Sequence, residues 1–266
     1  MLHADARIAV AGATGRVGRH LVEVLEERGH DVVRMSRATG VDVVTGEGLA
    51  QALTDVEAIV DAATGPSPEQ EPATRFFTAA ARNLQEAGAR AGVRRLVAVS
   101  IIGADRFTAG YGAAKVAHEQ ATLAGPVPAR VIRAAQFHEF VEELAGWGRQ
   151  GDVSYVPEMR TQLVAARTVA ETLADVATGP DTLFASGSGA VIPEIAGPRE
   201  ENLLEVARLL MERRGDAVRI EVGGDPSDPD HDVYTSGGLL PGPDAILAGP
   251  TFAEWLEADV PARAGR

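Results

Sequence analysis

The sequence predicts an α/β fold in which a doubly wound parallel sheet carries helices on both faces. Short apolar runs suited to buried strands alternate with segments of helical periodicity over residues 1–150. A glycine-rich turn joins the first apolar run to the first helical segment. The alternation is looser after residue 150, where we expect a smaller α+β region at 151–266, with 160–180 returning to the first half.

The first element is a strand over residues 8–11, followed at once by a glycine turn and an amphipathic helix that ends near Gly29. Such a turn presents free backbone amides at the positive end of a helix dipole and can bind a phosphate. Gly12 permits the tight turn, Gly15 lets the backbone approach a pyrophosphate, and Gly18 lets helix and strand pack closely. We expect cofactor contacts from Gly12, Ala13, Thr14, Gly15, Arg16, Val17 and Gly18.

The second strand, residues 31–35, ends in Ser36 and Arg37. In dinucleotide-binding folds this position lies beside the adenosine ribose, where a carboxylate favours NAD and an arginine accommodates the 2′-phosphate of NADP. No carboxylate follows until Asp42, which we place at the adenine edge. The sequence therefore predicts that NADP(H) is preferred over NAD(H).

A third strand over residues 58–63 leads into a proline-rich acidic loop at 64–72. We expect Ala62, Ala63 and Thr64 to face the cofactor, because ligands of such sheets bind beyond the carboxyl ends of the strands. The loop is either a lid or a plain connector.

Four further elements complete the expected sheet and its helices, at residues 74–88, 94–100, 112–123 and 129–133. In the second half, 169–177 and 198–214 have helical patterns, and 225–232 is a polar loop. We expect this half to cover the substrate end of the crevice.

The composition narrows the function further. A net charge of −13 argues against a nucleic-acid binder, and the absence of cysteine excludes disulfides and thiolate chemistry. No apolar run approaches the roughly 18 residues that a membrane span needs, and the N-terminus lacks the pattern of a signal peptide. We expect a cytoplasmic protein, monomeric or homodimeric, that acts on a small molecule without a membrane, nucleic-acid or metal partner.

One pair of residues carries the expected chemistry. Tyr111 and Lys115 are four residues apart on a helix, and Lys115 is the only lysine beside 24 arginines. That spacing puts both side chains on one helical face. We expect the ammonium to lower the pKa of Tyr111, so that the phenol exchanges a proton as hydride moves, and to hold the nicotinamide ribose.

These motifs resemble the short-chain dehydrogenase/reductase superfamily: the glycine turn, Arg37, Val99-Ser100 and Tyr111-x-x-x-Lys115. Residues 99–103, 133–140, 194–198 and 251–256 resemble its atypical NmrA-like NAD(P)H-binding branch. The resemblance implies a Rossmann core, NADP(H) and a smaller C-terminal substrate region. Members of the branch include reductases of quinones and other carbonyl or olefinic compounds, and redox sensors that bind the cofactor without turnover.

The resemblance implies a third catalytic residue, Ser100, at the end of the fourth strand. In related enzymes the active hydroxyl often lies one or two places later, where this chain has Ile101 and Ile102. We therefore expect an NADPH-dependent reductase of a small, largely apolar carbonyl or quinone-like compound. The alternatives are a non-catalytic NADP(H) sensor, and an epimerase or dehydratase that retains its nicotinamide cofactor.

Substrate contacts are expected from Gln136, Phe137 and His138, which follow the fifth strand at the mouth of the crevice. His138 is a candidate acid or hydrogen-bond donor to a substrate oxygen. It lacks the second histidine of an H-E-x-x-H zinc motif. The aspartates of the 225–232 loop are typical of a solvated charge run, so no metal site is expected.

Overall fold

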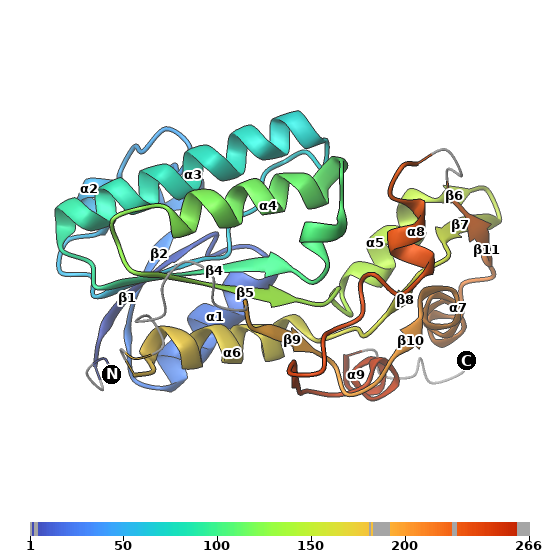
Figure 1. Cartoon of the computed structure of the whole chain (residues 1–266). Coiled ribbons are helices and arrows are strands. Elements are labelled where there is room, and N and C mark those ends of the chain that lie inside the picture. Colours follow the sequence, from blue (N-terminus) through green and yellow to red (C-terminus); the bar gives the residue numbers. More distant parts are fainter. Residues whose placement is uncertain (1, 3–4, 181, 183–191, 225–227, 260–266) are drawn as a thin grey trace.

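The computed structural model describes residues 2, 5–180, 182, 192–224 and 228–259. Seven parallel strands form its central sheet, in the order β12-β9-β5-β4-β3-β1-β2 (Figure 1). This is the doubly wound parallel sheet that the sequence predicts. Its strands are β1 (Arg7–Ala11), β2 (Asp31–Met35), β3 (Ala58–Asp61), β4 (Arg95–Ile101), β5 (Ala129–Ala134), β9 (Glu194–Ala196) and β12 (Ile246–Leu247).

The strand order reverses between β1 and β3, which are hydrogen-bonded neighbours. The chain leaves β1 toward β2 on one side and returns to β3 on the other, so the connections diverge above the carboxyl ends of these two strands. Ligands of open α/β sheets bind in the crevice at such a point. The glycine turn and residues 62–64 therefore lie at the same edge.

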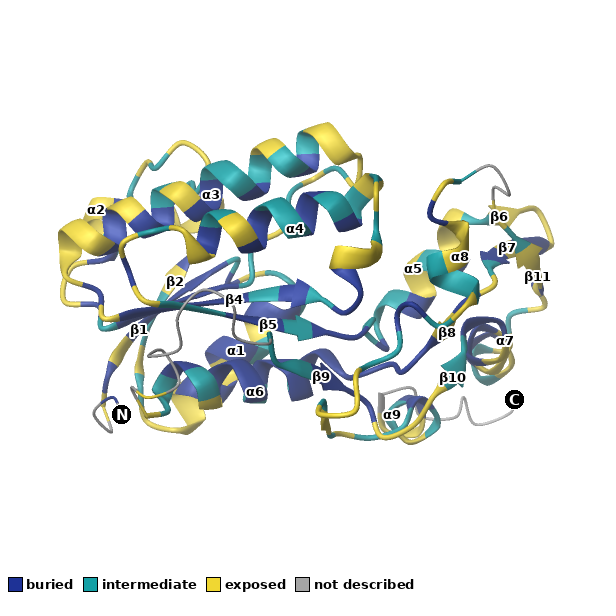
Figure 2. Ribbon diagram, viewed as in Figure 1, coloured by how far each residue is buried: buried dark blue, intermediate teal, exposed yellow. Residues whose placement is uncertain are grey.

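Two helical layers cover the sheet (Figure 1). The first, which we call the α1/α6 layer, consists of α1 (Arg16–Glu27) and α6 (Ala166–Thr178). The second, the α3/α4 layer, consists of α3 (Gln70–Ala91) and α4 (Gly110–Leu123), with the short α2 (Leu49–Ala52) beside it. The strands between the two layers are buried on both faces, which explains their continuous apolar runs (Figure 2).

A smaller unit, which we call the C-terminal lobe, lies beyond the carboxyl edge of the sheet (Figure 1). Its own core includes Val141, Val156, Leu210 and Phe252. Its elements are α5 (Phe140–Trp147), β6 (Arg149–Gln150), β7 (Val153–Pro157), β8 (Arg160–Thr161), β10 (Glu201–Asn202), α7 (Leu203–Arg214), β11 (Arg219–Gly223), α8 (His231–Thr235) and α9 (Phe252–Asp259).

The second half of the chain also contributes to the core. Helix α6 packs against α1, and β9 and β12 extend the sheet beyond β5. Two helices differ in extent from the sequence patterns. Helix α3 begins at Gln70, inside the proline-rich loop, and α7 begins only at Leu203, where the Asn202 side chain accepts the Leu204 amide. None of the helices in the described residues is long and apolar enough to cross a membrane.

Candidate functional site

The glycine turn after β1 is held by steric limits that only glycine meets. Gly12 adopts a φ of +73°, and a Cβ there would lie 2.7 Å from the Ala62 carbonyl oxygen. A Cβ on Gly18 would lie 2.0 Å from the Gly12 carbonyl oxygen, well inside van der Waals contact. Gly15 is less constrained, because its Cβ would lie 3.1 Å from the same oxygen. Gly12 and Gly18 are therefore required for the conformation of the turn. Gly15 is not required in this way, but its lack of a side chain leaves the backbone of the turn accessible.

Some of the other side chains of the turn are buried in the core, and others are accessible from the crevice. Ala13 and Val17 are buried against the α1/α6 layer, whereas Thr14 is exposed. The Arg16 guanidinium forms an ion pair with Glu143 of α5 and lies 5.7 Å from the centroid of the Phe140 ring. Arg16 thus connects the glycine turn to the C-terminal lobe.

At the end of β2, the two arginines have different surroundings. Arg34 forms an ion pair with Glu26 at 2.6 Å. The exposed Arg37 guanidinium has no hydrogen bond or ion pair within the described residues. Ser36 is engaged with Thr39 in a capping box, and the Asp42 carboxylate accepts the amides of Val44 and Thr45. Arg37 is therefore the cation left available beside the expected ribose position.

Tyr111 lies at the first turn of α4, and its hydroxyl is 3.2 Å from the Thr64 hydroxyl. Its ring packs edge-on against Phe77 of α3, with the ring centroids 5.7 Å apart. Burial raises the pKa of Tyr111 above 10, opposed by the Thr64 hydrogen bond and by the charge of Arg16. The phenol is therefore protonated at neutral pH. The expectation that Lys115 lowers this pKa is wrong in this structure.

Lys115 points into the α3/α4 layer instead. Its ammonium donates to the Val99 carbonyl oxygen at 2.8 Å and to His118 Nδ1 at 3.0 Å. It also lies over the Phe77 ring, 4.3 Å from the centroid. Burial lowers the pKa of Lys115 to about 8, opposed by the charges of Asp61 and Glu119. Two of the three ammonium protons are thus engaged in hydrogen bonds. The contact of Lys115 with the ribose hydroxyls stays a prediction.

Ser100 is buried on β4, and its hydroxyl has no hydrogen-bond partner within the described residues. The only hydrogen bond of the Tyr111 hydroxyl in that part of the chain is to Thr64. The structure therefore pairs Tyr111 with Thr64, and brings neither Ser100 nor Lys115 into hydrogen-bond contact with it.

The three residues after β5 serve the packing of the lobe. Gln136 Oε1 accepts the Thr161 hydroxyl at 2.6 Å, and Phe137 forms a bridge with Val164. His138 is 1% exposed and packs between Phe252 and Trp255. Burial lowers the pKa of His138 to about 4, opposed by the hydrogen bond to the Pro250 carbonyl oxygen.

This geometry fixes the tautomer of His138. A carbonyl oxygen only accepts, so Nε2 carries the proton donated to Pro250 at 3.1 Å, and Nδ1 is unprotonated at neutral pH. Nε2 is therefore already engaged as a donor, while the ring lines the groove beside the glycine turn. The expected substrate contact of His138 stays a prediction.

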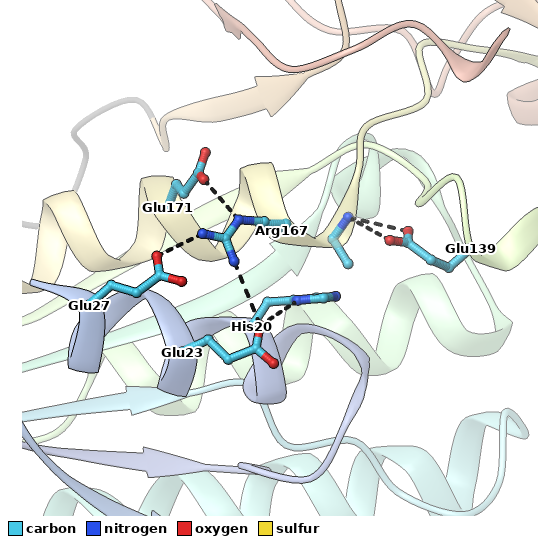
Figure 3. A network of polar contacts seen from close by, with 7 residues as sticks. His20, Glu23, Glu27, Glu139, Arg167 and Glu171 are labelled. Atoms are coloured by element: carbon cyan, nitrogen blue, oxygen red, sulfur yellow. Dashed lines mark hydrogen bonds and ion pairs between the residues drawn. The ribbon is translucent and has the colours of Figure 1, made fainter. Parts of the chain in front are cut away.

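A groove of about 750 Å³ borders the glycine turn on the side of the lobe. Thr14, Gly15 and Arg16 line one end, and residues of α5, α6 and α9 line the other. Glu139 lines the groove, and its carboxylate accepts the Ala166 amide at the start of α6 (Figure 3). Tyr111 is not among the residues that line this groove.

Sequence reasoning did not predict the structural roles of three residues that bond to α4 or to the segment just before it. Asp61 and His118 extend the contacts of Lys115 beneath α4, and Asp230 of the polar loop accepts the amides of Thr108 and Ala109 just before α4. The acidic loop therefore has a structural anchor rather than only a solvated charge run. The only sequence feature that pointed to these contacts was the single lysine, Lys115. It indicated that α4 is important but not which way the lysine side chain points.

Comparison with known proteins identifies an NAD(P)H-binding region in this chain. Residues 12–134 match a family model described as NAD(P)H-binding. A 3-diazoavenalumate denitrifying reductase from a Streptomyces species is 32% identical over 216 residues, which cover 72% of this chain and 62% of the relative. The chain spans from 31% to 62% of the length of the curated relatives it matches.

Among solved structures, MoeE5 in complex with UDP-glucuronic acid and NAD has a TM-score of 0.70 at 18% identity, covering 95% of this chain and 99% of the other. The NADPH-dependent quinone oxidoreductase of Escherichia coli has a TM-score of 0.64 at 19% identity, covering 94% and 98%. The Rossmann-type fold and the NAD(P)H-binding domain predicted from the motifs are thus confirmed.

Proposed function

We propose that this chain is an NADPH-dependent oxidoreductase of the short-chain dehydrogenase/reductase type that reduces a small, largely apolar carbonyl or quinone-like compound. The observation that carries the proposal is the half-buried Tyr111 hydroxyl, which is hydrogen-bonded to Thr64 at the carboxyl edge of β3 and whose raised pKa keeps it protonated at neutral pH. NADPH, when bound on the glycine turn, supplies the hydride. The relatives named as reductases support this reaction class.

The residues of the chain supply the proton. A carbonyl that accepts hydride needs a proton on its oxygen, and the raised pKa of Tyr111 keeps that proton on the phenol until it is required. Thr64 is exposed and 3.2 Å away, so its hydroxyl can pass a proton from water back to the phenolate. Arg16 stabilises the phenolate by its charge.

The preference for NADPH is part of the same proposal and rests on Arg37. Arg37→Glu should weaken NADPH binding by roughly 10-fold to 100-fold, since a charge-assisted hydrogen bond contributes about 1.5–3 kcal/mol. NADH binding should change much less, because NADH has no 2′-phosphate. Fluorescence titration of both cofactors measures the effect, and Arg34→Gln, which alters an arginine already paired with Glu26, is the control. Equal losses for both cofactors would refute the role of Arg37.

The experiment for the reaction is NADPH consumption against a panel of quinones and enones. Tyr111→Phe should lower kcat by roughly 100-fold or more while NADPH binding is retained, because only the proton donor is lost. Tyr155→Phe is the matched control, since Tyr155 lies on the exposed face of β7 in the lobe. Full turnover by Tyr111→Phe would exclude the phenol as the proton donor.

A non-catalytic NADP(H) sensor is the second candidate. The observation that favours it is that Ser100 has no hydrogen-bond partner in the described part of the chain and Lys115 is engaged beneath α4. A sensor would bind NADPH in the titration but consume it with no member of the panel. Turnover that depends on Tyr111 would exclude it.

A further inference from the structure

Three side chains beneath α4 form a buried chain that the proposed reaction does not use directly. Lys115, His118 and Asp61 are each at most 4% exposed. Lys115 Nζ lies 3.0 Å from His118 Nδ1, and His118 Nε2 lies 3.0 Å from Asp61 Oδ2. We call these residues the Lys–His–Asp chain. It connects β4, where Val99 accepts from Lys115, to the end of β3, where Asp61 lies.

The order of donors along the chain follows from chemistry. An ammonium only donates, so His118 Nδ1 must accept, and Nε2 then carries the ring proton and donates to Asp61. Burial lowers the pKa of His118, and the charge of Lys115 lowers it further. Burial alone would raise the pKa of Asp61, but its hydrogen bond with His118 and its other partners lower it overall. A neutral imidazole therefore separates a buried cation from a buried carboxylate.

The chain reaches the reacting phenol by two routes. Asp61 Oδ1 accepts the Ala63 amide at 3.0 Å, and the next residue, Thr64, holds the Tyr111 hydroxyl. The second route is Phe77, whose ring stacks on His118 at 4.9 Å and contacts the Tyr111 ring at 5.7 Å. Phe77 thus contacts the Lys–His–Asp chain directly, and Thr64 directly follows the residue whose amide donates to Asp61.

We propose that Asp61 and His118 are positioning residues that anchor the loop after β3 and the first turn of α4, and so align Thr64 and Tyr111 for proton transfer. The proposal rests on the function proposed above. Lys115 serves as the buried cation that the pair holds against β4, rather than as a ligand of the ribose. Since a displacement of about 1 Å can cost 100-fold in rate, fixing these hydroxyls has a direct catalytic consequence.

Two substitutions test the chain. His118→Phe keeps an aromatic ring against Phe77 but removes both hydrogen bonds. Asp61→Asn leaves one amide oxygen to serve two donors, the Ala63 amide and His118 Nε2, so one hydrogen bond must break. Each variant should lower kcat by roughly 10-fold to 100-fold, a larger factor than the change in the KM for NADPH, because the glycine turn and Arg37 are untouched.

A readout independent of turnover is the ionisation of Tyr111. The chain has three tyrosines, so the ultraviolet pH titration of each protein minus that of its Tyr111→Phe derivative isolates this phenol. A loosened Tyr111 gains water, and its pKa should fall from its raised value toward about 10. Gln85→Leu is the matched control. Gln85 is another buried polar residue of the α3/α4 layer, but it bonds Thr122 and Val127, away from Tyr111. It should lower thermal stability without moving kcat or the pKa of Tyr111.

The outcomes distinguish the positioning role of Asp61 and His118 from the proposed function on which it rests. If Tyr111→Phe is fully active, the phenol is not the proton donor and that part of the proposed function fails, while the titration of Tyr111 still tests whether the Lys–His–Asp chain positions the phenol. If Tyr111→Phe is inactive but folded His118→Phe and Asp61→Asn both match the Gln85→Leu control, the positioning role is refuted.

Should both variants fail to fold, nitrogen-15 NMR of the wild type decides the question. The proposal requires His118 to be protonated on Nε2 and to show no titration near its ordinary pKa of about 6.5. A ring protonated on Nδ1, or one that titrates like an exposed histidine, would overturn it.

Discussion

The two helical layers of the core cover the same sheet but differ in what they bury. The α1/α6 layer meets β1, β3 and β4 through an apolar cluster that includes Val10, Val60, Val97, Leu21 and Leu173. The α3/α4 layer meets the opposite faces of the same strands, yet buries Lys115, His118, Asp61 and Ser100 there. The α1/α6 layer also buries a charged side chain, Arg95, whose guanidinium donates to the Ala177 and Gly179 carbonyl oxygens. Buried polar groups cost free energy unless they are satisfied, and those beneath α4 form a chain of side chains, so the α3/α4 layer is the one in which to look for function.

The largest effect is expected where the α1/α6 layer touches the glycine turn. Gly18→Ala would put a Cβ 2.0 Å from the Gly12 carbonyl oxygen, so α1 must move away from β1. We expect a loss of about 3 kcal/mol or more in the free energy of unfolding, and loss of NADPH binding with it. Urea denaturation measures the first and fluorescence titration the second.

Gly15→Ala is the matched control, because its Cβ would lie 3.1 Å from the same oxygen at an ordinary φ of −78°. It should cost at most about 1 kcal/mol in stability while weakening cofactor binding, since its position faces the expected pyrophosphate. Similar stability losses for both variants would show that the turn does not divide into a packing glycine and a binding glycine.

The contrast between the layers also explains how far the sequence predicts this protein. Apolar periodicity gave the strands and helices of the sheet, because their burial on both sides leaves continuous runs. The glycine turn was predictable because its conformation is local. The direction of Lys115 was not, because i, i+4 spacing fixes a helical face but not which of two neighbours the side chain reaches. His138 shows the same limit, since its partners Pro250 and Trp255 are more than 100 residues away.

A second prediction compares a buried residue of each layer as a function of pH. The pKa of Lys115 is about 8 in the folded protein and about 10.5 in an unfolded chain. Between these values the unfolded chain binds more protons, so wild-type stability should rise with pH across this window, by up to about 3 kcal/mol. Lys115→Met removes this titration and should flatten that part of the curve. The charges that oppose the effect of burial on Lys115 are those of Asp61 and Glu119.

Leu21→Ala is the counterpart in the α1/α6 layer. Leu21 is fully buried on α1, so its truncation should cost about 2–5 kcal/mol at every pH. Denaturant unfolding at pH 7.5, 9 and 10 gives the free energy of unfolding of wild type, Lys115→Met and Leu21→Ala as a function of pH. Subtracting each variant from wild type cancels the contribution of the other titrating groups, which all three proteins share. A Lys115→Met curve that stays parallel to wild type would mean that the ammonium is not buried as described, and the contrast between the layers would lose its main support.

The smallest effect is expected from the exposed polar contacts of the α1/α6 layer. Arg167 on α6 contacts Glu23 and Glu27 of α1 and Glu171 of its own helix (Figure 3). Its side chain is 43% exposed, and surface ion pairs contribute about 0–1 kcal/mol because water and salt screen them. Arg167→Gln should therefore change the free energy of unfolding by less than about 1 kcal/mol, with a difference that shrinks further at high salt.

Arg167→Gln tests whether the contribution of a polar network to stability and turnover depends on its burial or on its number of partners. Arg167 has as many ionic partners as Lys115 has contacts, and both join elements of one layer. Measured side by side in low and high salt, the two substitutions should differ in pH dependence, in salt dependence and in their effect on turnover. An Arg167→Gln variant that lost turnover, or several kcal/mol of stability, would show that the outer surface of the α1/α6 layer also carries function.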